Sequence, residues 1–147
     1  MRALLLYIAL ILLAPLGYAQ NYIGVHKDAV RRFVPNDFAG FVLEYEGNAN
    51  SRTFIKFVDA VQEQTLIFVF DPNDICVSMS RMYNTWYYDK LHKSLQLSYL
   101  YLGSNTWLDE RNGQQYEIRL KRNNWFVTVV TRRHKPAEHP PKLTLTD

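Results

Sequence analysis

The sequence predicts an α+β fold in which an antiparallel sheet carries two helices on one face, in the order helix, three strands, helix, three strands. Two amphipathic segments with helical spacing each precede a series of short, strand-like runs. Turn sequences such as Asp71-Pro72-Asn73-Asp74 and Asn112-Gly113 separate neighbouring runs, and such short turns join antiparallel strands. Helices that cover one face of such a sheet make a two-layer sandwich.

The first helix is predicted over His26–Val34. Ala29, Val30 and Phe33 fall on one face, and charged residues fall on the other. Pro35 is expected to end this helix, because the residue before a proline is displaced from the helical conformation.

Strand-like runs follow at residues 41–45, 52–58 and 65–70, and the chain returns in a β-hairpin at 75–83. Together these runs amount to about three strands in the predicted order. The run 65–70 is apolar on both faces, which indicates a central strand.

The longest helix is predicted between a cap at Asn84 or Thr85 and Gly103, which is placed to terminate it. Asp89 lies in the first turn, where a negative charge is favourable. The apolar stripe recurs at steps of three and four residues and consists of Tyr88, Leu91, Leu95, Tyr99 and Leu102.

Three final strands are predicted at residues 106–110, 115–120 and 125–131, joined by tight turns. We therefore expect one α+β domain over residues 20–132. The proline-rich, basic segment 133–147 is expected to be a flexible tail.

The first 19 residues resemble a cleavable secretory signal peptide. Arg2 supplies a positive charge, residues 3–14 are apolar, and Gly17 and Ala19 are the small residues expected before a cut at Gln20. An uncleaved anchor is the alternative, but it needs about 20 predominantly apolar residues. The sequence therefore predicts an exported domain, periplasmic or secreted, with no membrane span after cleavage.

Cysteine content and charge narrow the class of protein further. Cys76 is the single cysteine, so no internal disulfide is possible, which favours a bacterial exported protein over a small eukaryotic secreted domain. Packing is the expected role of Cys76, with a reactive thiol or an intermolecular disulfide as alternatives. The formal net charge of +3 comes from basic residues near the C-terminal end, so a nucleic-acid groove is disfavoured.

Several motifs spread along the chain resemble a group of small exported proteins common in Bacteroidetes. The matching features are Tyr22-Ile23-Gly24-x-x-Lys27-x-x-Val30, Gln64-Thr65-Leu66-x-Phe68, Cys76, Trp107, Tyr116-x-Ile118 and Trp125-Phe126-x-Thr128-Val129. The resemblance implies a bacterial source and one compact domain, and no particular activity. The helix start Gly24-x-x-Lys27-x-x-Val30 also resembles the β-lactamase-inhibitor-like fold and the small outer-membrane assembly lipoproteins that share it. This chain departs from them because it lacks a lipid-bearing cysteine and has Pro35 in place of the usual glycine turn.

Catalytic signatures are weak in this sequence. No serine stands in a nucleophile elbow and no glycine-rich phosphate loop is present, so neither a catalytic residue nor a cofactor is predicted. No metal site is predicted either, since His134, Glu138 and His139 lie in the expected tail. The carboxylate pairs Asp109-Glu110 and Glu44/Glu46 leave a small periplasmic hydrolase or lyase as an alternative function.

Aromatic density is the feature that points to binding. Tyr83, Trp86 and Tyr87 cluster where the strand enters the long helix, and Tyr101 follows on that predicted helix. These four residues are predicted to form a binding corner, because exposed aromatic side chains are favoured at binding surfaces. We therefore expect a non-enzymatic binding module for a protein or a cell-envelope component. A structural envelope protein is the remaining alternative, and the sequence indicates neither a specific partner nor an oligomeric state.

Overall fold

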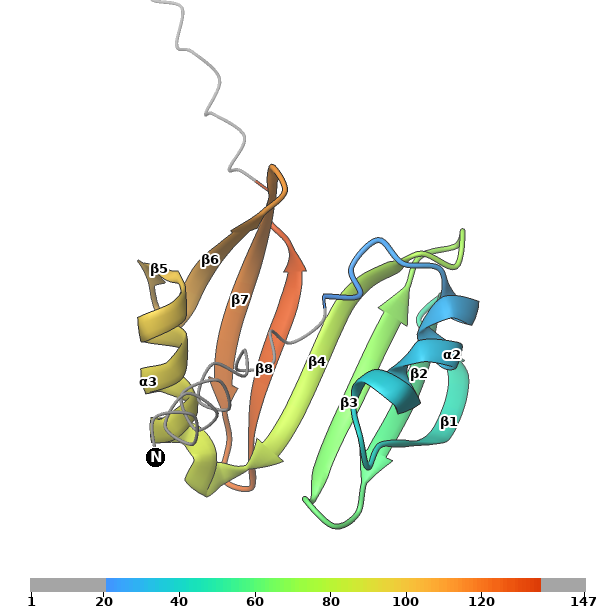
Figure 1. The fold of residues 1–147 in the computed structure, drawn as a ribbon, viewed down its shortest axis with the longest axis horizontal. Helices are drawn as coiled ribbons and strands as arrows, with labels where there is room; N and C mark the ends of the chain where they lie inside the picture. Colours follow the sequence, from blue (N-terminus) through green and yellow to red (C-terminus); the bar gives the residue numbers. More distant parts are fainter. Residues whose placement is uncertain (1–20, 136–147) are drawn as a thin grey trace, which may run out of the picture.

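The computed structural model describes residues 21–135, which form one antiparallel sheet of eight strands with two α-helices (Figure 1). The predicted signal peptide, residues 1–19, and the predicted tail from residue 136 onwards lie outside the described residues. The strands lie side by side in the order β1-β2-β3-β4-β8-β7-β6-β5. The elements are α2 (Lys27–Asp37), β1 (Val42–Ala49), β2 (Arg52–Asp59), β3 (Gln64–Phe70), β4 (Cys76–Asn84), a 3-10 turn η1 (Thr85–Tyr87), α3 (Tyr88–Ser98), β5 (Leu100–Gly103), β6 (Thr106–Arg111), β7 (Gln114–Arg122) and β8 (Phe126–Arg133).

The α+β class and the antiparallel sheet are confirmed, but the predicted arrangement, with two helices on one face and three strands after each helix, is only partly right. One helix precedes the sheet and the other interrupts it after β4, and four strands, not three, follow each helix. In the first half, all four strand-like runs of the sequence are separate strands. The two halves meet where β4 pairs with β8, so the last strand of each half lies at the centre of the sheet.

The second half contains a strand that was predicted to be helix. Helix α3 ends at Ser98, Tyr99 has an extended backbone, and Leu100–Gly103 pairs with β6 as β5. The helical spacing of apolar residues that begins at Tyr88 continues through Tyr99 to Leu102, and for this reason the sequence predicts a helix up to Gly103. Pairing with β6 decides the structure, because it satisfies backbone groups and seats Tyr101 beside Trp107, with ring centres 5.3 Å apart.

Helix α2 continues past the predicted end at Pro35. A proline inside a helix removes one backbone hydrogen bond, and its ring crowds the carbonyl four residues earlier, so other contacts of the last turn must offset this cost. The last turn is held by the Phe38 amide, which donates to the Val34 carbonyl, and by the Tyr22 hydroxyl, which donates to Asp37. The buried face also differs from the predicted one: Val30 and Val34 are buried, whereas Phe33 is exposed.

Two hydrophobic clusters fill the space between the helices and the sheet. The first lies between α2 and strands β2–β4 and contains Val30, Val34, Phe57, Phe68 and Phe70, all fully buried. The second lies between α3 and strands β6–β8 and is built around Trp107, which is also fully buried. Of the predicted helical stripe, Tyr88, Leu91, Leu95 and Tyr99 belong to this second cluster.

The antiparallel order places the connecting turns at two opposite ends of the sheet (Figure 1). The start of β4 and the end of β8 lie at one end, and the end of β4 and the start of β8 lie at the other. Each end carries one of the two candidate sites described below.

Candidate functional site

The predicted binding corner lies where β4 ends and η1 begins, but only one of its four residues is largely exposed there. Trp86 has 74 % of its surface exposed. Tyr83 and Tyr87 pack against each other with ring centres 5.9 Å apart and border the second cluster. Tyr101 lies apart from them on the edge strand β5, where it packs against Trp107. Burial also raises the pKa of the Tyr83 phenol above its ordinary value.

Two further aromatic residues, not predicted as part of the site, lie beside Trp86. Trp125 and Phe126 are 76 % and 44 % exposed, and Phe126 is the direct cross-strand partner of Asn84. The turn between β7 and β8 therefore lies next to η1, and Arg122 Nε donates to Thr85 Oγ1 at 3.3 Å. We call the surface formed by Trp86, Trp125 and Phe126 the aromatic end.

Asparagine side chains fix the backbone of both turns that carry the aromatic end. Asn84 Oδ1 accepts from the Trp86 amide at 3.4 Å, and Asn123 Oδ1 accepts from the amides of Trp125 and Phe126 at 2.9 and 2.6 Å. Such side-chain contacts pin tight turns in place. The exposed aromatic rings therefore stand on hydrogen-bonded turns, which reduces the entropy lost when they are covered.

Basic side chains surround the aromatic end. Lys121 and Arg122 are exposed at the end of β7, and Lys90 is exposed in the first turn of α3. The Arg122 guanidinium lies 4.9 Å from the centre of the Tyr88 ring, and Lys90 Nζ lies 6.0 Å from that of Tyr87. Asp89 is the acidic residue in the same helical turn.

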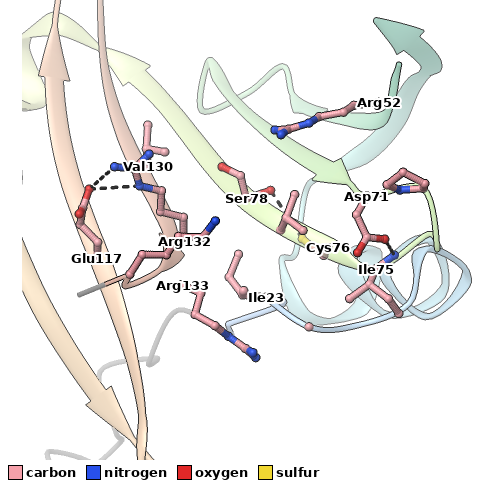
Figure 2. Close-up of a pocket in the computed structure, with 14 residues that line it drawn as sticks. Ile23, Arg52, Asp71, Ile75, Cys76, Ser78, Glu117, Val130, Arg132 and Arg133 are labelled. Carbon is pink, nitrogen blue, oxygen red and sulfur yellow. Dashed lines mark hydrogen bonds and ion pairs between the residues drawn. The ribbon is translucent and has the colours of Figure 1, made fainter. Parts of the chain in front are cut away.

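A second candidate site, at the opposite end of β4 and β8, is a cavity of about 700 Å³ (Figure 2). Its walls come from the lead-in segment at Ile23, from the turn between β3 and β4, and from the ends of the central strands. The backbone amide of Gly24 donates to the Cys76 carbonyl at 2.8 Å, and the backbone amide of Cys76 donates to the Val25 carbonyl at 2.9 Å. The lead-in segment therefore runs beside the start of β4.

A β-bulge and a small side chain shape this cavity. The pairing of β3 with β4 shifts between Val69, which faces Ser78, and Phe70, which faces Cys76, so Val77 has no partner on β3. A bulge of this kind bends the strand locally. Ser78 pairs with Val69 on one side and with Arg132 on the other, and its side chain is smaller than either. Ser78 lines the cavity at this point of β4.

Cys76 lines the cavity with its backbone but is not a reactive thiol. Its side chain is 1 % exposed and belongs to the first cluster, which is the packing role expected for it. Burial raises its pKa to about 12, against a smaller lowering effect of the hydrogen bond to the Ser78 carbonyl. At neutral pH the thiol is therefore protonated and a poor nucleophile.

Three of the four carboxylates considered for acid–base chemistry are engaged in ion pairs. Asp109 is buried and pairs with Arg111 at 2.7 Å, whereas neighbouring Glu110 is exposed. Glu46 pairs with Arg31 at 2.7 Å. Glu44 pairs separately with a lysine of β2, Lys56. Residues 21–135 contain no group of three side chains that could hold a metal ion.

Comparison of the chain with protein-family models, with curated proteins and with solved structures finds no match. Within the described part of the chain, no helix is long and apolar enough to cross a bilayer. The function is therefore inferred from the geometry at the two ends of the sheet.

Proposed function

We propose that this protein is an exported, non-enzymatic binding module that docks on an anionic lipid surface of the cell envelope through its aromatic end. The export half of the proposal rests on the signal-like sequence of the first 19 residues. The docking half rests on one observation: two tryptophans, Trp86 and Trp125, are about three-quarters exposed on adjacent turns.

The side chains of the aromatic end suit a lipid–water interface. Tryptophan is favoured at the level of the lipid headgroups, because its ring is largely apolar and its N–H remains hydrogen-bonded. Basic residues next to an anionic membrane contribute about 1 kcal/mol each. Lys90, Lys121 and Arg122 place such charges beside the exposed rings.

Other exposed apolar residues support the same orientation. Val61 is 88 % exposed in the turn between β2 and β3, which the antiparallel order places at the same end of the sheet as η1. Apolar side chains therefore project from three separate turns at this end. Insertion of three turn tips would bury apolar surface without unfolding any strand.

Co-sedimentation with lipid vesicles tests the proposal. We expect the protein to bind vesicles of phosphatidylethanolamine and phosphatidylglycerol, and the double variant Trp86→Ala/Trp125→Ala to bind at least about tenfold more weakly. This estimate follows from the 1.5–3 kcal/mol gained when a large apolar side chain is buried. Leu97→Ala removes an equally exposed apolar side chain from α3 and is the matched control.

The result that contradicts the proposal is equally specific. Binding by the double variant at the affinity of the parent protein would exclude the aromatic end as the docking surface. Binding only to protein components of the envelope, with none to the vesicles, would exclude a lipid surface as the partner.

A further inference from the structure

The cavity at the start of β4 carries an excess of positive charge (Figure 2). Four basic and two acidic side chains line it. Both acids accept hydrogen bonds from the protein itself, but only Glu117 is in an ion pair, so the formal charge of Asp71 still counts in the cavity. Asp71 Oδ1 accepts from the amides of Asn73 and Ile75, and Glu117 Oε1 accepts from Arg119 and from Arg132 at 2.7 Å.

Three cations of the cavity, Arg52, Arg133 and Lys135, have no ion-pair partner within residues 21–135. Against the charge of Asp71 they leave an excess of two positive charges among the lining residues. They come from different elements: Arg52 begins β2, Arg133 ends β8, and Lys135 follows it. Figure 2 shows Arg52 on one side of Ser78 and Arg132 on the other. Like charges held around one cavity repel each other, and a bound anion relieves that repulsion.

The remainder of the lining is largely apolar. Ile23, Ile75, Val77 and Val130 contribute side chains between the charged groups, and Pro72 lies at the turn. The volume of about 700 Å³ lies within the range that small-molecule sites occupy, and such sites combine apolar walls with a few polar groups. A ligand that fits has an apolar body in addition to its charge.

From this combination we infer that the cavity binds a phosphate monoester with an apolar chain. Guanidinium groups pair with phosphate oxygens through two parallel hydrogen bonds, which favours Arg52 or Arg133 as the phosphate ligand and leaves the other to add positive charge to the cavity. A phosphate monoester carries between 1.5 and 2 negative charges at neutral pH, against one for a carboxylate, and so matches an excess of two positive charges better. The apolar chain lies along Ile23, Ile75, Val77 and Val130.

This inference does not depend on the proposed docking surface. The cavity lies at the opposite end of β4 and β8 from the aromatic end. A protein that fails to bind vesicles can still bind the phosphate monoester, and each result is read separately.

Calorimetric titration with four probes tests the inference. Octyl phosphate carries the proposed head and chain, inorganic phosphate carries only the head, octanoate has the weaker charge, and octyl glucoside has the chain without charge. We expect octyl phosphate to bind at least about tenfold more tightly than each of the other three. Octanoate and octyl glucoside lose charge-assisted hydrogen bonds, each of which contributes about tenfold in affinity, and inorganic phosphate loses the burial of the apolar chain.

Variants assign the binding to this cavity. Arg52→Gln/Arg133→Gln should weaken octyl phosphate binding by at least about tenfold, and Lys135→Gln alone by a smaller factor. Arg32→Gln removes the same charge from the exposed surface of α2 and should leave the affinity unchanged. All four substituted residues are exposed, so the melting temperature should stay at the parent value.

Three outcomes overturn the inference. Octyl phosphate does not bind, or it binds no better than octyl glucoside or inorganic phosphate, or the double variant binds it as tightly as the parent and the Arg32→Gln control do.

Discussion

At the scale of single residues, Cys76 shows how burial sets chemistry in this protein. Its side chain is almost fully buried in the first cluster, although Cys76 is one of the residues that line the cavity. The folded chain holds it protonated with a pKa of about 12, whereas the thiol of the unfolded chain ionises near pH 9.

This difference predicts a loss of stability in alkaline solution. Between pH 9 and pH 12 the unfolded chain releases a proton that the folded chain keeps, so the free energy of unfolding falls as the pH rises, by at most about 1.4 kcal/mol per pH unit. Cys76→Ala lacks the thiol, so its free energy of unfolding should fall less steeply. Urea denaturation of both proteins at several pH values measures the difference. Tyrosine ionisation contributes equally to both pH profiles and cancels when they are compared. Parallel pH profiles would contradict the assigned burial of the thiol.

Residues of the candidate sites were predictable only where local sequence decides their position. Trp86 lies at the junction of a strand and a helix, and both were visible in the sequence. The last strand was predicted to begin at Trp125, but β8 begins at Phe126 and Trp125 lies in the preceding turn. Its proximity to η1 depends on the pairing of β8 with β4. Arg52 and Arg133 are 81 positions apart in the sequence, and only the sheet brings them to one cavity.

At the scale of elements, short-range patterns predicted which segments are helices and which are strands better than where each one ends. The stripe from Tyr88 to Tyr99 packs as predicted, but Leu100–Gly103 takes its conformation from β6. Pro35 fits in the last turn of α2 because the Tyr22 hydroxyl donates to Asp37 and the Phe38 amide closes the turn on the Val34 carbonyl. In each case a tertiary contact outweighs the local preference, which is less than about 1 kcal/mol for most residues and about 3 kcal/mol for a proline inside a helix.

Strand β4 carries the side chain that joins the two halves. The Arg81 guanidinium lies 5.8 and 5.3 Å from the ring centres of Phe38 and Phe41, and 5.1 Å from that of Tyr83. It also donates to Gln64 Oε1 at 3.0 and 2.6 Å. Arg81 therefore contacts aromatic residues of the first cluster and a tyrosine that borders the second.

Removing this side chain should be costly. We expect Arg81→Ala to lower the free energy of unfolding by about 2–4 kcal/mol, because it removes several ring contacts and leaves the buried Gln64 amide without its partner. Arg32→Ala, at an exposed position, should change it by less than about 0.5 kcal/mol. Chemical denaturation measures both values, and an equal effect of the two substitutions would exclude a joining role for Arg81.

At the scale of the whole molecule, two clusters share one continuous sheet. Seven residue pairs join β4 to β8, and Tyr116 of β7 belongs to the cluster that α2 covers. The halves therefore share backbone hydrogen bonds and part of a core, and we expect them to unfold together.

Two natural probes can measure this cooperativity. All three tryptophans lie in the second half of the chain, and the single cysteine belongs to the first cluster. We predict that tryptophan fluorescence and the reactivity of the Cys76 thiol change at the same urea concentration. Separate midpoints would show that the halves unfold independently and would contradict the single cooperative unit.

The central claim is that the aromatic end meets a lipid surface, and tryptophan quenching tests it most directly. Trp107 is fully buried, so Trp86 and Trp125 account for the fluorescence that a soluble quencher such as acrylamide can reach. On addition of phosphatidylglycerol-containing vesicles, we predict a shift of the emission to shorter wavelength and a fall in acrylamide quenching to the level of Trp107 alone. Emission and quenching that stay unchanged while the vesicles bind the protein would place the contact elsewhere and contradict the account.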